Sequence, residues 1–228
     1  MINNMKSKRK MDVLTAIQQR YTSKAYDPTR SIPTAQFERL IQLLRLTPSS
    51  INIQPWQFMV ADHAHAKQRI AKALVDKYAY NAPKVLASSH SIVFCSKTDI
   101  DEQHLDRILQ QEIQDGRFRD LKAQQGQQQS RQGYVDFYRQ EKGDISRWTE
   151  NQTFIALGQL LLAASFEGID ATPIGGFNEQ ILSQELNLTA QGLKPSVIVA
   201  LGYHHDDDFN ATLPKSRLDE QLIMTRIE

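Results

Sequence analysis

The chain has 228 residues, of which 40% are hydrophobic and 23% charged, so it can bury the core of one domain or of two small ones. Its 27 Lys and Arg residues nearly balance its 26 Asp and Glu residues, which gives no reason to expect a nucleic acid or a membrane surface as a partner. A single cysteine, Cys95, excludes an intrachain disulfide.

The distribution of apolar residues predicts the domain bounds and gives no sign of a membrane segment. Residues 1–10 are polar and basic, with no apolar stretch behind them that could form a signal peptide or an anchor. The longest apolar segment, residues 154–164, is far shorter than the roughly 20 residues that span a bilayer. We expect a flexible tail over residues 1–10, a single domain over residues 11–228 and a cytoplasmic location.

The first predicted helix leads into a cluster of cations and hydroxyls. Apolar residues at positions 13, 14, 17 and 21 have helical spacing. The helix runs into the segment Arg20-Tyr-Thr-Ser-Lys24, whose two cations and two hydroxyls can donate hydrogen bonds to phosphate oxygens. Taken alone, these residues fit a solvated helix end better, because cations are favourable at the C-terminal end of a helix.

A shaped loop is predicted between the second helix and the first strand. Apolar residues recur at helical spacing over residues 37–44, and Pro48 ends that helix. Residues 58–61 are a short apolar run of the strand type. Small hydroxyls and amides lie between these elements, where binding residues are common, although a plain helix-to-strand turn is an equally good explanation.

The next segments predict one helix and one buried strand. Residues 64–78 have helical spacing and lead to the pair Asn81 and Lys84. Apolar residues surround Cys95 and predict a buried strand. The cysteine is therefore expected to be a small core residue and not a nucleophile.

Three segments in the middle of the chain differ sharply in polarity. Residues 105–113 have the spacing of an amphipathic helix. Residues 122–132 are rich in glutamine and nearly free of apolar side chains, so we expect a mobile connection there. Residues 154–164 are apolar nearly all round, which predicts a helix buried on every side, either at the centre of the monomer or in a dimer interface.

The last third of the chain contains a glycine pair and a second cation cluster. Gly175-Gly176 precedes a predicted helix and would let backbone N–H groups approach a ligand closely. Residues 196–202 form the clearest strand pattern, and the run 222–227 predicts a C-terminal strand. Between them, Lys215-Ser216-Arg217 again places two cations and a hydroxyl together.

These features favour a ligand that is held and not attacked. The chain contains no G-x-G-x-x-G fingerprint, Walker loop, nucleophile elbow or zinc-ligand spacing, so no metal is expected. Two cation clusters, an amide–lysine pair and a hydroxyl–amide loop suit a phosphorylated ligand with a polar ring. We therefore expect a cofactor that carries the chemistry itself.

Six segments, in this order, resemble the FMN-dependent nitroreductase family: residues 20–24, 48–56, 81–84, 115–118, 173–177 and 210–217. The likeness is strongest to bacterial oxygen-insensitive NAD(P)H nitroreductases, also described as dihydropteridine reductases, and to the related NAD(P)H:flavin reductases. It implies an α+β fold with a mixed sheet wrapped by helices, in an intertwined homodimer with FMN at the subunit interface. The C-terminal run would then join the sheet of the partner.

The resemblance also implies roles for individual residues. The FMN phosphate would be held by Arg20, Thr22, Lys215 and Arg217, and the flavin of the other subunit would be reached by Pro48, Ser49, Ser50 and Asn52. The expected cofactor-binding residues are Arg20, Tyr21, Thr22, Ser23, Lys24, Pro48, Ser49, Ser50, Asn52, Asn81, Lys84, Gly175, Gly176, Lys215, Ser216 and Arg217. The residues expected to contact NAD(P)H or the substrate are Lys24, Ile51, Asn81, Lys84, Arg117 and Tyr134.

The implied activity is a ping-pong oxidoreduction centred on the flavin, with no catalytic side chain. NAD(P)H would deliver hydride, and a nitroaromatic compound or a quinone would then take the electrons in pairs. Four residues depart from the family pattern: Gly175 replaces glutamate, Ile51 a small hydroxyl residue, Tyr134 phenylalanine and Thr22 serine. The alternatives are an NAD(P)H:flavin or dihydropteridine reductase and an FMN-binding protein that does not turn over.

Overall fold

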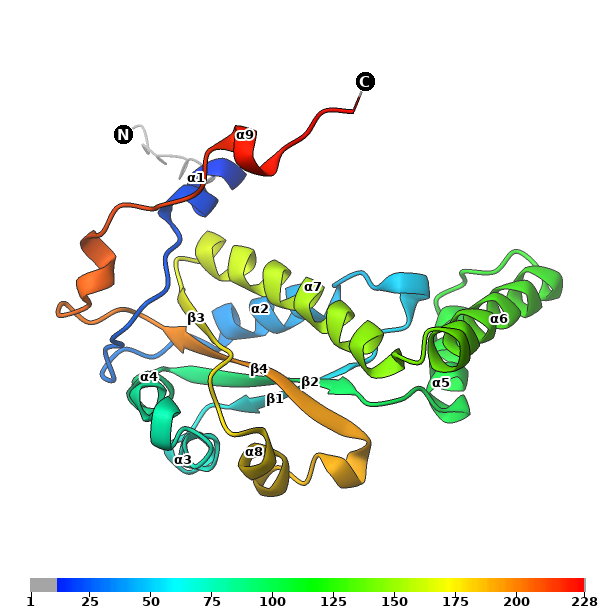
Figure 1. The fold of residues 1–228 in the computed structure, drawn as a ribbon, viewed down its shortest axis with the longest axis horizontal. Helices are drawn as coiled ribbons and strands as arrows, with labels where there is room; N and C mark the ends of the chain where they lie inside the picture. The colour runs from blue at the N-terminus through cyan, green and yellow to red at the C-terminus, as the bar shows by residue number, and fades with distance from the viewer. Residues whose placement is uncertain (1–11, 228) are drawn as a thin grey trace, which may run out of the picture.

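The computed structural model describes residues 12–227 and is organised around a four-stranded sheet (Figure 1). The strands are β1 (Trp56–Ala61), β2 (His90–Lys97), β3 (Asp170–Ile174) and β4 (Leu193–Gly202). Their order is β1-β2-β4-β3, and every neighbouring pair is antiparallel. The predicted α+β class is confirmed, but the strands of the described chain pair only in the antiparallel sense and form no mixed sheet. The predicted tail over residues 1–10 lies outside the described residues.

Strand β2, one of the two inner strands, is buried on both faces, and its side chains alternate between two apolar clusters. Ile92 and Phe94 belong to one cluster, whereas Val93 and Cys95 belong to the other, and all four are fully buried. Successive side chains of a strand point to opposite faces, so a strand that is covered on both sides needs a continuous apolar run. The prediction that Cys95 is a core residue of a strand is confirmed.

Helices cover both faces of the sheet (Figure 1). One face is covered by α2 (Thr34–Arg45) and α7 (Ile145–Phe166), and the other by α3 (Ala64–Ala71), α4 (Ala82–Ala87) and α8 (Glu179–Glu185). Beyond one end of the sheet lie α5 (Glu102–Gln114) and α6 (Leu121–Asp136), and towards the other lie α1 (Val13–Gln19) and α9 (Glu220–Ile223). None of the helices in residues 12–227 is long and apolar enough to cross a membrane.

Helix α7 is buried on one face only in the single chain. Ala156, Leu160 and Ala164 pack into the core beneath it. On the opposite face, Phe154 and Ile155 are each 46% exposed. The prediction of burial on every side is therefore wrong for one chain, and the apolar outer face of α7 has no cover among the described residues.

The glutamine-rich segment is a helix and not the mobile connection that was expected. Residues 122–132 lie inside α6, where Asp120 accepts a hydrogen bond from the Ala123 N–H at 2.7 Å and so caps the first turn. Glutamine has good helix propensity, but it gives no apolar periodicity. The buried residues of α6 are Arg131 and Val135, so most of its surface is polar.

Two further predicted elements differ from the structure. The helix expected over residues 64–78 ends at Ala71, and residues 76–81 form a 3₁₀ helix that begins at Asp76, whose φ of 52° is left-handed. The C-terminal run forms no strand in the described chain, because residues 220–223 are helical and residues 224–227 extend away, exposed. An exposed strand without a neighbour has no hydrogen-bonding partner, so this run needs another chain to pair.

Candidate functional site

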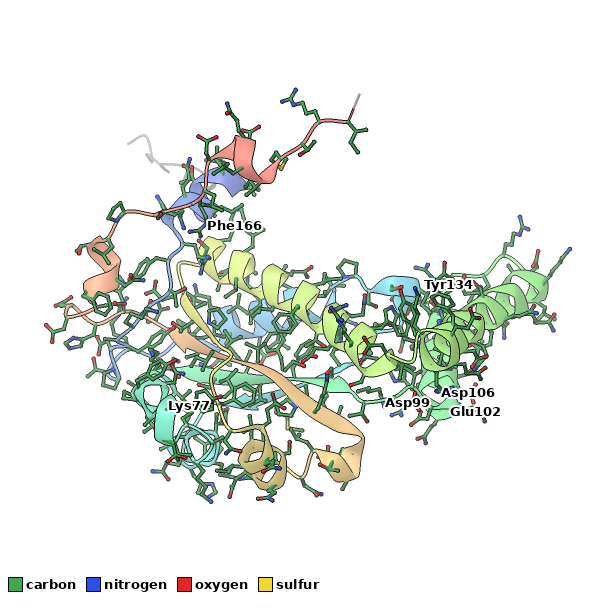
Figure 2. All side chains as sticks on the ribbon, viewed as in Figure 1. Lys77, Asp99, Glu102, Asp106, Tyr134 and Phe166 are labelled. Atoms are coloured by element: carbon green, nitrogen blue, oxygen red, sulfur yellow. The ribbon has the colours of Figure 1, made fainter. Side chains whose placement is uncertain are left out.

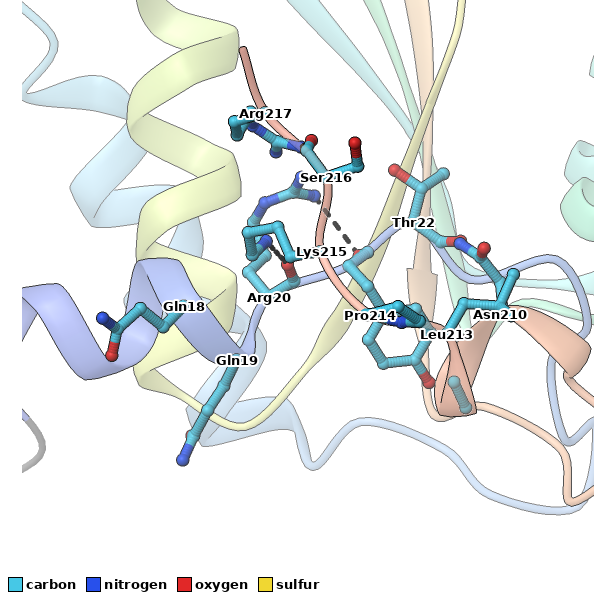
Figure 3. A pocket seen from close by; sticks show the side chains of 12 residues that line it. Gln18, Gln19, Arg20, Thr22, Asn210, Leu213, Pro214, Lys215, Ser216 and Arg217 are labelled. Carbon is cyan, nitrogen blue, oxygen red and sulfur yellow. Dashed lines mark hydrogen bonds between the residues drawn. The ribbon is translucent and has the colours of Figure 1, made fainter. Parts of the chain in front are cut away.

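A polar cavity lies where the end of α1 meets the C-terminal segment (Figure 3). Its volume is about 340 Å³, and its lining includes Arg20, Thr22, Asn210, Lys215, Ser216 and Arg217. We call Arg20, Lys215 and Arg217 the cation cluster. The two segments that supply it are far apart in the sequence, and both were singled out above for phosphate binding.

Three hydrogen-bonded groups join the two segments. Lys215 Nζ donates to the Arg20 carbonyl, and Asn210 Nδ2 donates to the Thr22 carbonyl at 2.7 Å. The carboxylate of Asp208, only 2% exposed, accepts from the N–H groups of Lys24 and Asn210, each at 3.0 Å. Asp208 therefore fixes both walls of the cavity, and nothing in the local sequence pattern indicated this role.

The cation cluster lacks a counter-charge. None of its members forms a salt bridge with another residue of the described chain. Burial, and then the Arg217 charge, lowers the pKa of Arg20. Burial and the charges of Arg20 and Arg217 lower the pKa of Lys215. Clustered cations of this kind fit a dianionic group such as a phosphate, which would offset their repulsion.

A second polar group is linked to the segment 20–24 through the charge of Lys24. Lys84 is only 7% exposed, and its Nζ donates to Asn81 Oδ1 at 2.7 Å and to the Tyr80 carbonyl at 3.1 Å. Burial, and then the charge of Lys24, lowers the pKa of Lys84. Asn81 Nδ2 in turn donates to the Gly176 carbonyl at 3.0 Å. These groups offer amide and ammonium donors that a polar ring could use.

The glycine pair borders this second group. A Cβ atom at Gly176 would come within 3.0 Å of the Tyr78 ring and 3.3 Å of Asn81 Nδ2, so only glycine fits there without a shift. At Gly175 a Cβ atom would meet nothing within 4 Å, so this position accommodates a larger side chain. Two other residues of the segment 20–24 are less accessible to a ligand. Ser23 is fully buried, and the Tyr21 ring packs edge-on against His204.

The predicted hydroxyl–amide loop has a left-handed backbone. Ile51, Asn52 and Gln54 have φ values of 48°, 55° and 43°. Such conformations cost about 1–3 kcal/mol each in residues other than glycine, and the cost is high for a β-branched residue. The loop is held by bonds from Ser50 N–H to Gln152 Oε1 and from Gln54 N–H to Ser49 Oγ, both at 2.9 Å, while Pro48 is exposed at its start.

A buried ion pair, which sequence reasoning missed, underlies this loop. Arg131 of α6 donates to both carboxylate oxygens of Glu112 of α5 at 2.8 and 2.7 Å. Asn52 Nδ2 also donates to Glu112 Oε1, at 3.0 Å. The amide of Asn52 is therefore already engaged inside the protein. Arg131 went unnoticed because it lies in the glutamine-rich segment.

The predicted site residues form two separate groups in one chain. At the C-terminal end of α7, Ser165 Oγ donates to the Ala16 carbonyl of α1, beside the cation cluster. Gln152 holds the loop thirteen residues earlier on α7, about 20 Å along the helix axis at 1.5 Å per residue. Tyr134, 49% exposed, lies near the end of α7 that holds the loop, and Phe166 lies at the opposite end of α7 (Figure 2). Arg117, whose side chain is mostly exposed, also lies at the loop end, where it faces Glu112 at 3.9 Å.

Cys95 is expected to be unreactive in the native protein. It is fully buried in β2, and burial raises its pKa to about 12, so roughly one thiol in ten thousand is ionised at pH 8. We expect native protein to leave DTNB uncleaved over an hour, and protein unfolded in guanidinium chloride to react with one equivalent. Stoichiometric labelling of the native protein would contradict the burial.

Comparisons with known proteins agree with these features. A family model described as "Nitroreductase family" matches residues 17–203. An oxygen-insensitive NAD(P)H nitroreductase of Salmonella typhimurium is 37% identical over 217 residues, which cover 95% of this chain and 100% of the relative. The corresponding enzyme of Enterobacter cloacae is 38% identical over 215 residues, 94% and 99% of the two chains.

Two further likenesses concern a flavin enzyme and the fold. The major NAD(P)H-flavin oxidoreductase of Aliivibrio fischeri is 33% identical over 214 residues, which cover 93% of this chain and 97% of the relative. A protein from Exiguobacterium sibiricum, solved in complex with FMN, superimposes with a TM-score of 0.80 at 22% identity, covering 95% of this chain and 98% of that chain. At that identity the structural likeness carries the fold alone.

Proposed function

The chain belongs to the nitroreductase family, and from that premise we propose that it is an FMN-dependent NAD(P)H oxidoreductase that reduces nitroaromatic compounds, and also quinones, in two-electron steps. One observation carries the proposal. The cation cluster has no carboxylate partner in the described chain, and the segment that supplies Arg20 also supplies Lys24, whose charge acts on Lys84 of the buried Asn81–Lys84 pair.

The residues present fit FMN. The cation cluster and Thr22 would bind the phosphate, while Asn81, Lys84 and the backbone at Gly176 would bind the ring. FMN supplies the hydride acceptor and donor when it is bound. The protein would supply orientation and positive charge, and the ammonium groups of Lys24 and Lys84 would stabilise negative charge on the ring.

The proposal includes a homodimer. The apolar outer face of α7 and the exposed C-terminal run need cover, and the left-handed loop lies about 20 Å along α7 from the cation cluster. A second copy that packs on α7 would bring its own Pro48, Ser49, Ser50 and Asn52 towards the flavin. Gly158 supports this arrangement, because it lies exposed inside α7 and a Cβ atom there would meet nothing within 4 Å of the single chain.

The remaining site residues are assigned to NAD(P)H and the electron acceptor. Lys24, Ile51, Asn81, Lys84, Arg117 and Tyr134 would contact the nicotinamide or the acceptor that follows it in a ping-pong cycle. We further propose that residues 11–228 form one FMN-binding domain acting in the cytoplasm, where NAD(P)H is supplied. Free flavin is the second candidate acceptor, favoured by the 33% identity to the Aliivibrio fischeri enzyme.

The test is the visible absorbance of the purified protein under anaerobic conditions. We expect a yellow protein whose flavin band bleaches on mixing with NADPH or NADH and returns when a nitroaromatic compound is added. Free FMN or a dihydropteridine as the only competent acceptor would favour the reductase alternative. A colourless protein that takes up no FMN, or a yellow one that neither cofactor bleaches, would contradict the proposed enzyme.

A further inference from the structure

The left-handed loop, residues 49–54, cannot owe its shape to local preference. Ile51 is β-branched, and its φ of 48° and ψ of 25° lie in a region that such residues avoid. Asn52 and Gln54 add two more left-handed residues within the same turn. A conformation of this kind persists only where contacts from outside the loop impose it.

The contacts that impose it come from Glu112 and Arg131. Arg131 Nε donates to the Ile51 carbonyl at 3.2 Å, and Glu112 Oε1 accepts from Asn52 Nδ2 at 3.0 Å. The Glu112–Arg131 pair thus binds Ile51 and Asn52, the two left-handed residues that follow each other in the chain. The side chains of Arg131 and Glu112 are 0% and 2% exposed, so water does not replace these bonds, and the nearest other cation, Arg117, lies 3.9 Å from Glu112 Oε1 and is mostly exposed.

Stability alone does not account for an ion pair in this place. The apolar residues around it, among them Ile53, Val135 and Trp148, form a cluster against which the Ile51 side chain packs. An apolar pair of similar volume is often as stable as a buried ion pair, which has to be desolvated. An apolar pair, however, could not bind a backbone carbonyl and an amide side chain at once.

We propose that Glu112 and Arg131 are positioning residues that set the binding of the reduced nicotinamide by holding the left-handed loop in shape. They do so without touching the ligand, because both side chains are buried beneath the loop. The effect on nicotinamide binding rests on the function proposed above. The effect on the loop does not, because it follows from hydrogen bonds within one chain.

The experiment compares Arg131→Lys with Asp99→Asn. Lysine keeps the charge but loses the fork that binds Glu112 and Ile51 at once. Asp99→Asn weakens a second Arg–carboxylate contact near the base of α5, Arg139 to Asp99 at 2.8 Å, which is partly exposed and has no bond to the loop. Glu112→Gln, which keeps an oxygen for Asn52, is the second variant if Arg131→Lys does not fold.

Two measurements are made on each variant. The first is hydrogen exchange at the N–H groups of Asn52, Ile53 and Gln54, which are bonded within the loop in the ligand-free chain. We expect their exchange to be at least about tenfold faster in Arg131→Lys, because the charged hydrogen bond that holds the Ile51 carbonyl is lost. The second is steady-state kinetics on protein saturated with FMN, where we expect KM for NADPH to rise about tenfold and kcat to change less than twofold.

The outcomes separate the inference from the proposed function. A loss of folding stability alone would lower the active fraction, and so the apparent kcat, without raising KM. Unchanged loop exchange in Arg131→Lys would overturn the inference, as would faster exchange with an unchanged KM, or equal effects in Asp99→Asn. A wild-type protein that binds no FMN would contradict the proposed function, while the exchange rates would still decide whether the pair holds the loop.

Discussion

Replacing Lys215 and Arg217 together with alanine is expected to weaken FMN binding by about 100-fold or more. Each cation that donates to a phosphate oxygen contributes about 1.5–3 kcal/mol, and about 1.4 kcal/mol corresponds to a factor of ten in affinity. Two lost contacts therefore predict roughly 10²- to 10⁴-fold weaker binding. The measurement is a titration of the ligand-free protein with FMN, followed by the quenching of flavin fluorescence.

The matched control removes two positive charges elsewhere. Lys122 and Lys142 are exposed and neither lines the cavity, so Lys122→Ala with Lys142→Ala changes the net charge equally. We expect its FMN affinity to stay within about twofold of the wild type at physiological salt, because exposed charges are screened over about 8 Å. Equal losses in both double variants would show that net charge, and not the cation cluster, binds the phosphate.

Gly158→Arg is expected to convert the protein into a monomer that no longer turns over. In the single chain a Cβ atom at this exposed position meets nothing within 4 Å, and arginine is a better helix former than glycine by up to about 1 kcal/mol. The monomer should therefore fold at least as well as the wild-type chain. In the proposed dimer the same side chain would enter the packed face of α7, so association is lost, and the loop of the second copy is lost with it.

Sedimentation equilibrium measures the outcome: Gly158→Arg should have a mass close to that of one chain, 26.1 kDa for the wild type, and the wild type twice that mass. The matched control is Gly126→Arg, the same change at an exposed glycine inside α6, where a Cβ atom also meets nothing within 4 Å. We expect this control to remain dimeric and active. A dimeric Gly158→Arg protein would exclude the outer face of α7 as the interface.

The elements predicted correctly are those whose pattern of apolar residues matches the faces that the rest of the protein covers. Strand β2 has a continuous apolar run because both of its faces are covered, and α5 has one apolar stripe because only one of its faces is. The two cation segments could be singled out because each places cations and hydroxyls close together in the sequence, and their role in phosphate binding stays a prediction. Their meeting in one cavity is what the structure adds.

The features that sequence reasoning missed depend on burial of charge. A carboxylate and a guanidinium nineteen residues apart give no sign in the sequence that they will be buried together, as Glu112 and Arg131 are. Asp208 is likewise 184 residues from the Lys24 N–H group that it accepts from. Helix α6 was misread because its main inward residue is an arginine, which hydrophobic periodicity counts as outward.

Because the cation cluster is proposed to bind the FMN phosphate, it would also tie the lifetime of the chain to the supply of its cofactor. Without an anion, the folded state holds Arg20, Lys215 and Arg217 close together against their mutual repulsion, which the unfolded chain relieves. A ligand that binds only the folded state stabilises it by about 2.7 kcal/mol at a hundredfold excess over Kd. In a cell short of FMN, ligand-free copies would unfold more often and be removed by proteases first, so the amount of protein would follow the amount of flavin.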